Sequence, residues 1–195
     1  MFIEASIVRG IGQGNFPWPV YIFNGEVSRF QTAEELIHLA WRNCSSNQSV
    51  AIACLERAMK LLPDDPYLFN QCALVNLAMN RHQEALQCLD HAIELAPELF
   101  FLQLNRGNAL MMLGYFDGAC SSVEKAIKLT RESGEKAFCL FQYGLFCLQK
   151  KLYFGAALAL SDACALQPAS KKYRDSLNLA CMLRAMESES EEKTK

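Results

Sequence analysis

The chain has 195 residues, a length that supports one well-buried core and is short for two independent domains. Hydrophobic residues make up 51% and charged residues 21% of it, which is typical of a globular protein and excludes a largely disordered chain. The formal net charge is -2, and lysine and arginine form no dense run. These features argue against nucleic acid or an anionic membrane as the partner.

Nine cysteines are scattered along the chain without short paired spacings. This pattern is unlike a secreted disulfide framework and favours free thiols in a reducing compartment. The first residues, MFIEASIVRG, carry Glu4 and Arg9 where a secretory signal needs a basic start and an uninterrupted apolar run. No stretch reaches the ~18 apolar residues of a membrane span. We therefore expect a cytoplasmic protein without membrane insertion.

Residues 1–31 form a leader that differs from the rest of the chain. Its glycines, in RGIGQGNF, lack the G-x-G-x-x-G spacing of a dinucleotide loop. Pro17 and Pro19 favour extended or turn structure over helix. The apolar cluster at 16–23 (FPWPVYIF) is unfavourable in water. We expect the leader to cover other residues, either as an N-terminal cap or as a self-ligand that a partner displaces.

After the leader, alanines recur with a period close to 34 residues. Ala51, Ala85, Ala119 and Ala156 are 34, 34 and 37 residues apart, and each is followed seven residues later by another alanine. Between the two alanines, four residues after the first, stands Leu55, Leu89, Val123 or Leu160. Pro63, Pro97 and Pro168 close three of the four units, whereas Arg131 replaces the proline in the third. Such a period is the signature of a repeat architecture.

These offsets resemble the tetratricopeptide repeat (TPR), whose second helix carries A-x3-F, a later alanine and a closing proline. Gly107 and Gly144 match the close-contact glycine of its first helix, whereas Leu39 and Ala73 replace it elsewhere. The resemblance implies an all-α, right-handed solenoid of about four helix-turn-helix repeats, at 32–65, 66–99, 100–133 and 137–170. The expected helix pairs are 32–44 with 47–61, 66–79 with 82–95, 100–113 with 116–131, and 135–150 with 153–166.

The connecting and terminal segments follow from the same register. Asn80 and Gly114 stand in equivalent turns, where a left-handed backbone is needed. The three extra residues of the third spacing fall in the surface loop TRESGEK. Residues 171–186 are amphipathic and predict a C-terminal capping helix, because the last repeat of a solenoid otherwise exposes its core face. The polar residues 187–195 are expected to be a disordered tail.

The sequence offers little support for catalysis or a cofactor. His82, Cys88, His91 and Cys54 could approach one another in a metal site, but no C-x2-C or H-x3-H pair anchors a tetrahedral set. Cys72 and Cys147 fall on faces that the repeat buries, and the three histidines share no cleft. We expect no catalytic, cofactor-binding or metal-binding residues and hence no enzyme.

The resemblance implies that the first helix of each repeat lines a concave groove that binds partners. Tyr67, Phe101 and Phe138 recur at one position and would form an aromatic row. The expected partner-binding residues are Tyr67, Asn70, Leu74, Phe101, Leu104, Asn105, Asn108, Met111, Phe138, Phe141 and Leu145. TPR co-chaperones that grip acidic peptide termini use lysine, asparagine and arginine in this groove. Here Asn70 or Leu104, and Gln142, stand where the cations would be, so a carboxylate clamp is not expected.

The function that these features favour is a protein-interaction module that binds an extended or helical peptide with apolar anchors, as an adaptor or client chaperone. In size, compartment and repeat number the chain is similar to TPR chaperones of type III secretion systems. One alternative is a structural subunit docked permanently in a larger assembly, for example a secretion apparatus. A metal-dependent enzyme is the last alternative. A homo-oligomer is compatible with the sequence, and nucleic acid is not.

Overall fold

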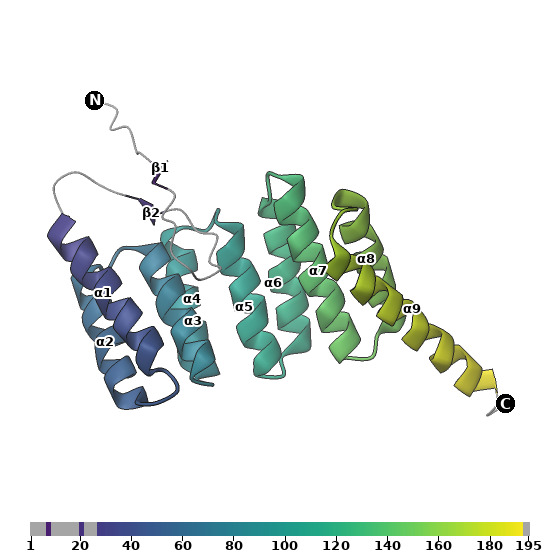
Figure 1. Ribbon diagram of the computed structural model, residues 1–195, viewed down its shortest axis with the longest axis horizontal. Helices are drawn as coiled ribbons and strands as arrows, with labels where there is room; N and C mark the ends of the chain where they lie inside the picture. The colour runs from purple at the N-terminus through teal and green to yellow at the C-terminus, as the bar shows by residue number, and fades with distance from the viewer. Residues whose placement is uncertain (1–6, 9–19, 22–26, 193–195) are drawn as a thin grey trace. The chain divides into compact units, whose positions relative to one another are not determined.

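The computed structural model describes residues 7–8, 20–21 and 27–192. Two short strands, β1 (Ile7–Val8) and β2 (Val20–Tyr21), pair antiparallel, with Ile7 opposite Tyr21 and Val8 opposite Val20. The rest of the described chain is helical (Figure 1). Its helices are α1 (Val27–Asn43), α2 (Gln48–Leu61), α3 (Pro66–Ala78), α4 (His82–Leu95), α5 (Phe100–Met112), α6 (Phe116–Leu129), α7 (Ser133–Gln149), α8 (Tyr153–Leu166) and α9 (Lys171–Glu192).

The chain divides into two compact units between Asp64 and Asp65. In the first unit, α1 packs against α2; in the second, α3 packs against α4, α5 against α6 and α7 against α8, with α9 on α8. The sequence predicted a single core. A solenoid divides readily at a repeat boundary, because each repeat contacts only its neighbours. The predicted helix pairs and capping helix are present, and the fold of the described residues is that of a helical-repeat solenoid.

Residues with a strong local preference set the helix ends. Pro66 occupies the first position of α3, where its missing N–H is not needed. The Asp65 carboxylate caps the same helix by accepting from the backbone N–H of Tyr67 at 2.8 Å and of Leu68 at 3.2 Å. At α7, Glu132 and Glu135 form a reciprocal capping box. The starts of α3 and α7 are therefore fixed by local hydrogen bonds as well as by packing.

The turns inside the second, third and fourth repeats have a left-handed backbone, which the sequence predicted at Asn80 and Gly114. Asn80 has φ 60° and Gly114 has φ 84°. Lys151 stands at the equivalent place of the next repeat and also has φ 60°. Asparagine and glycine adopt this conformation at little cost, whereas a lysine there stores local strain. The turn geometry is thus a property of the repeat, which α7 and α8 keep without a favourable residue.

Small residues let the two helices of a repeat cross closely. The repeating alanines, among them Ala85, Ala119 and Ala156, are fully buried. A Cβ added at Gly144 would stand 2.6 Å from Cγ of Leu160, and one at Gly107 would stand 2.8 Å from Cγ2 of Val123. The glycines are therefore required because the facing side chain occupies the space that a Cβ would need.

Two helices are longer than predicted. α1 begins at Val27, inside the segment 1–31 assigned to the leader, because no glycine or proline interrupts the chain after Gly25. α9 continues to Glu192, through most of the segment 187–195 predicted to be disordered. The glutamates of that segment favour helix once a preceding helix provides the nucleus. The predicted role of the leader as cap or self-ligand rests largely on residues 9–19 and 22–26, which lie outside the described residues.

Replacing Gly144 with alanine tests the close crossing. The new Cβ meets buried Leu160, and overpacking of this kind costs about 1–3 kcal/mol, more than the ~1 kcal/mol that alanine gains over glycine in a helix. We expect a lower urea midpoint for Gly144→Ala. Gly118→Ala is the matched control, because its Cβ would stand 3.4 Å from Leu110, an ordinary contact, and it should be neutral or stabilising. Equal midpoints for both variants would contradict the crossing.

Candidate functional site

The predicted groove residues lie on α3, α5 and α7, and the structure divides them into two groups. Six are exposed or half-buried: Tyr67, Leu74, Asn105, Asn108, Phe138 and Leu145. Five are buried, contrary to the expectation that they present their side chains to a partner: Asn70, Phe101, Leu104, Met111 and Phe141. The repeat register predicted where each residue lies on its helix, but it could not predict which of these side chains other helices bury.

The buried members have identifiable neighbours. Leu104 and Met111 belong to a core cluster with Val123 of α6 and Phe146 of α7. The Phe101 ring lies 5.7 Å from that of Tyr67, so two members of the predicted aromatic row do lie together. Packing within the repeats therefore uses side chains that the sequence assigned to a partner.

The capping helix covers the fourth repeat. The Tyr173 ring of α9 stacks on Phe141 of α7, with centroids 4.7 Å apart and planes inclined by 24°. The Lys172 ammonium lies 4.5 Å from the centroid of the same Phe141 ring. Phe141 is consequently only 1% exposed, whereas Phe138, one turn earlier on α7, is 38% exposed. The accessible surface of α7 is therefore around Phe138 and Leu145.

Two asparagines link neighbouring repeats. Asn105 on α5 donates from Nδ2 to Oδ1 of Asn70 on α3 over 2.8 Å. Asn70 is buried and fixes the orientation of its partner, while Asn105 is only half-buried. Asn108 is also half-buried, almost one turn further along α5. An amide held in this way presents both a donor and an acceptor, which is the chemistry that a peptide main chain requires.

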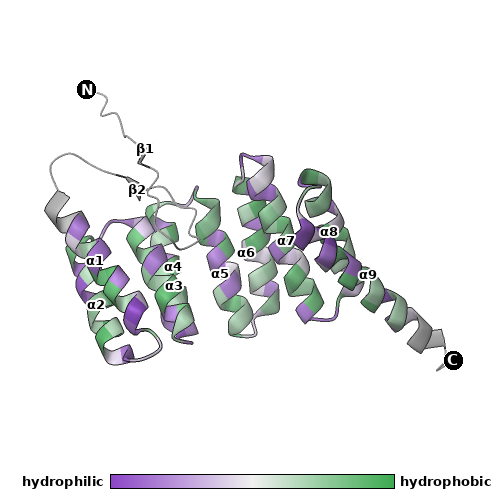
Figure 2. Cartoon of the chain, viewed as in Figure 1, coloured by the Kyte–Doolittle hydropathy of each residue, from purple (hydrophilic) through white to green (hydrophobic). Residues whose placement is uncertain are grey.

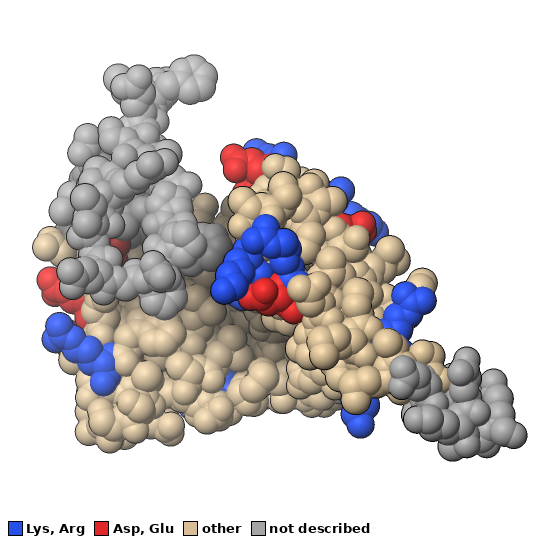
Figure 3. All heavy atoms as spheres, turned by 45° about the vertical axis from the view of Figure 1, so that its right-hand side comes forward, with Lys and Arg blue, Asp and Glu red and all other residues tan. Residues whose placement is uncertain are grey.

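The first helices of the second unit are almost free of charge. α3 contains no charged residue, α5 contains only Arg106, and α7 contains Glu135 and Lys136 in its first turn. The Arg106 guanidinium is directed to α4 and α6, donating from Nε to Asp90 at 2.7 Å and from Nη1 to the Ser122 hydroxyl at 2.9 Å. On the face shown in Figure 3, charged side chains form small separate groups, and other residues make up most of the described surface.

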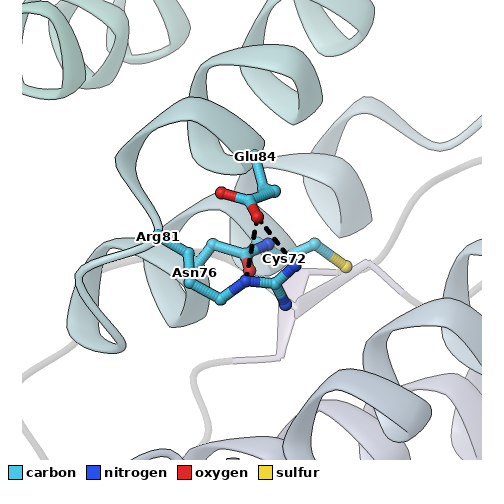
Figure 4. A network of polar contacts seen from close by, with 4 residues as sticks. All are labelled: Cys72, Asn76, Arg81 and Glu84. Carbon is cyan, nitrogen blue, oxygen red and sulfur yellow. Dashed lines mark hydrogen bonds and ion pairs between the residues drawn. The ribbon is translucent and has the colours of Figure 1, made fainter. Parts of the chain in front are cut away.

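A polar cluster closes the turn between α3 and α4 (Figure 4). Arg81 donates from Nε and Nη2 to Oε1 of Glu84 at 3.1 and 2.8 Å, and its backbone N–H donates to the Asn76 carbonyl at 2.9 Å. A backbone hydrogen bond, followed by the bond from Arg81, lowers the pKa of Glu84. Asn76 donates to the Cys72 carbonyl at 3.0 Å. These contacts hold the turn between α3 and α4 together.

The residues considered for metal binding do not converge. Within 27–192, no three histidine, cysteine, aspartate or glutamate side chains gather around one point. His91 instead packs edge-on against Phe69, with ring centroids 4.4 Å apart. Its Nδ1 lies 3.7 Å from Glu94. Cys88 is buried.

Burial also makes the core cysteines poor nucleophiles. It raises the pKa of Cys88 and of Cys147 to about 11, and that of Cys139 to about 12. The pKa of Cys72 is raised further by the same desolvation. A thiolate, not a thiol, is the reactive species, so these groups are inert near neutral pH. Their chemistry is that of small apolar core residues.

A shallow hollow of about 330 Å³, which the sequence did not indicate, lies among α6, α7 and α8. Its apolar lining includes Ile127, Tyr143 and Leu158, and Glu124 and Asp162 also border it. A comparison of the repeats could have indicated it, because Leu158 stands where the two preceding repeats hold Gln87 and Ser121. Leu158 is 58% exposed. The outer face of α8 is therefore more apolar than those of α4 and α6.

The helix pairs, their close crossings and their turns are those of the tetratricopeptide repeat, and residues 68–99 match the model of that repeat. The fold of the described residues is that of a tetratricopeptide-repeat solenoid, and the resemblance seen in the sequence is confirmed. None of the helices in the described part of the chain is long and apolar enough to cross a membrane.

Two curated relatives share part of the chain. Protein STIP1 homolog of Dictyostelium discoideum is 32% identical over 85 residues, covering 44% of this chain and 15% of that protein. Tetratricopeptide repeat protein 17 of Homo sapiens is 36% identical over 104 residues, covering 50% of this chain and 9% of that protein. The chain thus spans a small part of the length of both relatives.

Solved structures share the fold at lower identity. A MamA crystal structure superimposes with a TM-score of 0.62 at 15% identity, covering 84% of this chain and 88% of that chain. The first TPR of Spaghetti (RPAP3), solved bound to the HSP90 peptide SRMEEVD, gives a TM-score of 0.56 at 18% identity, covering 62% and 94%. These likenesses establish the fold alone.

Truncating Phe141 and Phe138 tests the division of the predicted groove. Phe141→Ala removes a buried ring that contacts Tyr173 and should cost about 3–5 kcal/mol. Phe138→Ala changes a partly exposed ring on the same helix and should cost no more than about 1 kcal/mol. Urea unfolding followed by circular dichroism measures both. Similar losses for the two variants would show that Phe138 also belongs to the core.

The buried thiols predict a loss of stability at alkaline pH. In the unfolded chain they ionise near their ordinary pKa of 9.0, whereas Cys88, Cys139 and Cys147 stay protonated in the folded chain to about pH 11–12. The unfolded state therefore binds fewer protons above pH 9, and the free energy of unfolding falls as the pH rises from 9 to 11.

Urea midpoints under reducing conditions at pH 8, 9 and 10.5 measure this slope. Cys139→Ala should flatten it, whereas Cys181→Ala, which removes an exposed thiol, should leave it unchanged. The comparison concerns slopes, because truncation at Cys139 also changes the stability itself. An identical slope in the Cys139→Ala variant would contradict the assignment.

Proposed function

We propose that this chain binds an uncharged polypeptide segment along α3, α5 and α7, acting as an adaptor or client chaperone. The observation that carries the proposal is the surface of these helices, in which half-buried amides and apolar side chains are accessible and cations are nearly absent. Tyr67, Leu74, Phe138 and Leu145 supply apolar contacts, and Asn105 and Asn108 supply hydrogen bonds.

The charge distribution supports a neutral ligand over an acidic one. The peptide bound by the Spaghetti (RPAP3) domain, SRMEEVD, contains three carboxylate side chains. A carboxylate taken from water needs a cation or several donors in return. In this chain Arg106 is already engaged with Asp90 and Ser122, away from α3 and α7. An acidic terminus would therefore find little compensation on these helices.

The amide pair supports an extended main chain as the bound form. Because Asn70 is buried and accepts from Asn105, the Asn105 side chain is held in one orientation before any ligand arrives. Pre-orientation of this kind lowers the entropy that binding must overcome. Main-chain hydrogen bonds of this kind are independent of sequence, so apolar anchors at Leu74 and Phe138 would supply the selectivity.

A random-peptide display library panned against the folded chain tests the proposal. We expect enriched peptides with apolar anchors, no excess of aspartate or glutamate, and affinities that change little with salt, because few charges are paired. Phe138→Ser and Asn108→Ala should each weaken binding of an enriched peptide about tenfold, close to 1.4 kcal/mol, with the melting temperature maintained.

Leu158→Ser is the control, since Leu158 is an exposed apolar side chain, 58% accessible against 38% for Phe138, but lies on α8. Enrichment of acidic peptides, or binding that the α5 and α7 variants leave unchanged, would contradict the proposal. Permanent docking into a larger assembly would instead give a chain that enriches no free peptide. The cytoplasm as its compartment and the likeness to type III secretion chaperones stay predictions.

A further inference from the structure

The capping helix α9 has an apolar stripe on the side that does not pack on the repeats. Its packed side is formed by Tyr173, Leu177 and Ala180. Leu179, Met182 and Met186 are 50%, 64% and 63% exposed, on a different side of the same helix. Figure 2 shows the hydrophilic start of α9 followed by hydrophobic residues along its length. At least half of the surface of each of these three side chains is therefore accessible.

The stripe has the spacing of a coiled-coil seam. Steps of three and four residues alternate from Leu179 to Met182 and to Met186. The same steps extend back to Asp175 and Lys172 and forward to Glu189, so that one seam runs from 172 to 189. Its middle is apolar and its ends are charged.

The charges at the two ends of α9 have opposite sign. Lys171, Lys172 and Arg174 lie in the first turn, and residues 187–192 contain four glutamates. A parallel pair of such helices would bring like charges together at both ends. An antiparallel pair brings the basic start of one helix to the acidic end of the other, which is favourable. The helix is thus complementary to itself in one orientation.

We propose that α9 binds α9 of a second copy of this chain, antiparallel, through the seam 172–189. In the register that aligns the seams, Leu179 of one copy faces Met182 of the other, and the basic first turn of one helix lies beside the acidic last turns of the other. α9 has 22 residues, a length of about 33 Å. One helix pair of this length lies at the lower end of the size of specific interfaces, so the dimer is weak and depends on concentration.

Sedimentation velocity over a range of concentrations tests the dimer. We expect Met182→Glu to raise the dissociation constant at least about tenfold, and 1 M salt to weaken the wild-type dimer by screening the end charges. Met112→Glu is the matched control, because Met112 is 58% exposed at the end of α5, outside the seam. A monomer at all concentrations would overturn the proposal and would indicate that the stripe binds a different partner. Equal weakening of the dimer by both variants would also overturn it.

Zero-length carbodiimide cross-linking tests the orientation. Within one helix, Lys172 and residue 189 are about 25 Å apart along the axis, too far for a direct amide bond. Links between Lys171 or Lys172 and a glutamate of 187–192, found by mass spectrometry in the dimer band alone, therefore report antiparallel pairing. A dimer band whose links all join other parts of the chain would overturn the assignment of the interface to α9.

Discussion

The close approach of the two helices in each repeat is the constraint on which the rest of the second unit depends. At Gly144 the backbone of α7 comes so near α8 that a Cβ would stand 2.6 Å from Leu160. Such proximity leaves no room for a larger side chain at Gly144, so this position cannot be enlarged unless Leu160 shifts. Because the crossing determines which side of each helix faces its partner, it also determines which sides face the next repeat and the solvent.

That constraint explains how α3, α5 and α7 can carry few charges and still pair with the correct helices. Because the crossings and turns determine which helices pair, α3, α5 and α7 need no charges for pairing. The charged bonds that do join repeats, such as Arg106 to Asp90, lie between a first helix and the second helix before it. The hydrogen bond between the side-chain amides of Asn70 and Asn105 joins α3 to α5 directly. A surface of amides and apolar groups is the result.

The sequence predicted the period, the helix pairs and the left-handed turns at Asn80 and Gly114, because each depends on residues close together in the chain. It did not predict which of the groove residues are buried by other helices. Phe138 and Phe141 look alike in a repeat register, yet Phe141 is buried because Tyr173, more than thirty residues later, stacks on it. The exposed Leu158 could have been found by comparing α8 with α4 and α6 position by position, because Gln87 and Ser121 stand at the equivalent places. The burial of Leu104 and Met111 depends on packing among several helices, which no local pattern describes.

The capping helix shows that one element can satisfy two requirements with different faces. The last repeat needs an apolar cover, and Tyr173, Leu177 and Ala180 provide it. A helix that served only as a cap would be expected to carry polar residues elsewhere, because exposed apolar surface is unfavourable by roughly 25 cal/mol per Å². α9 keeps one leucine and two methionines in water, at seam spacing and between ends of opposite charge. Neither stability nor solubility of the single chain accounts for that combination, whereas association of the helix with another surface does.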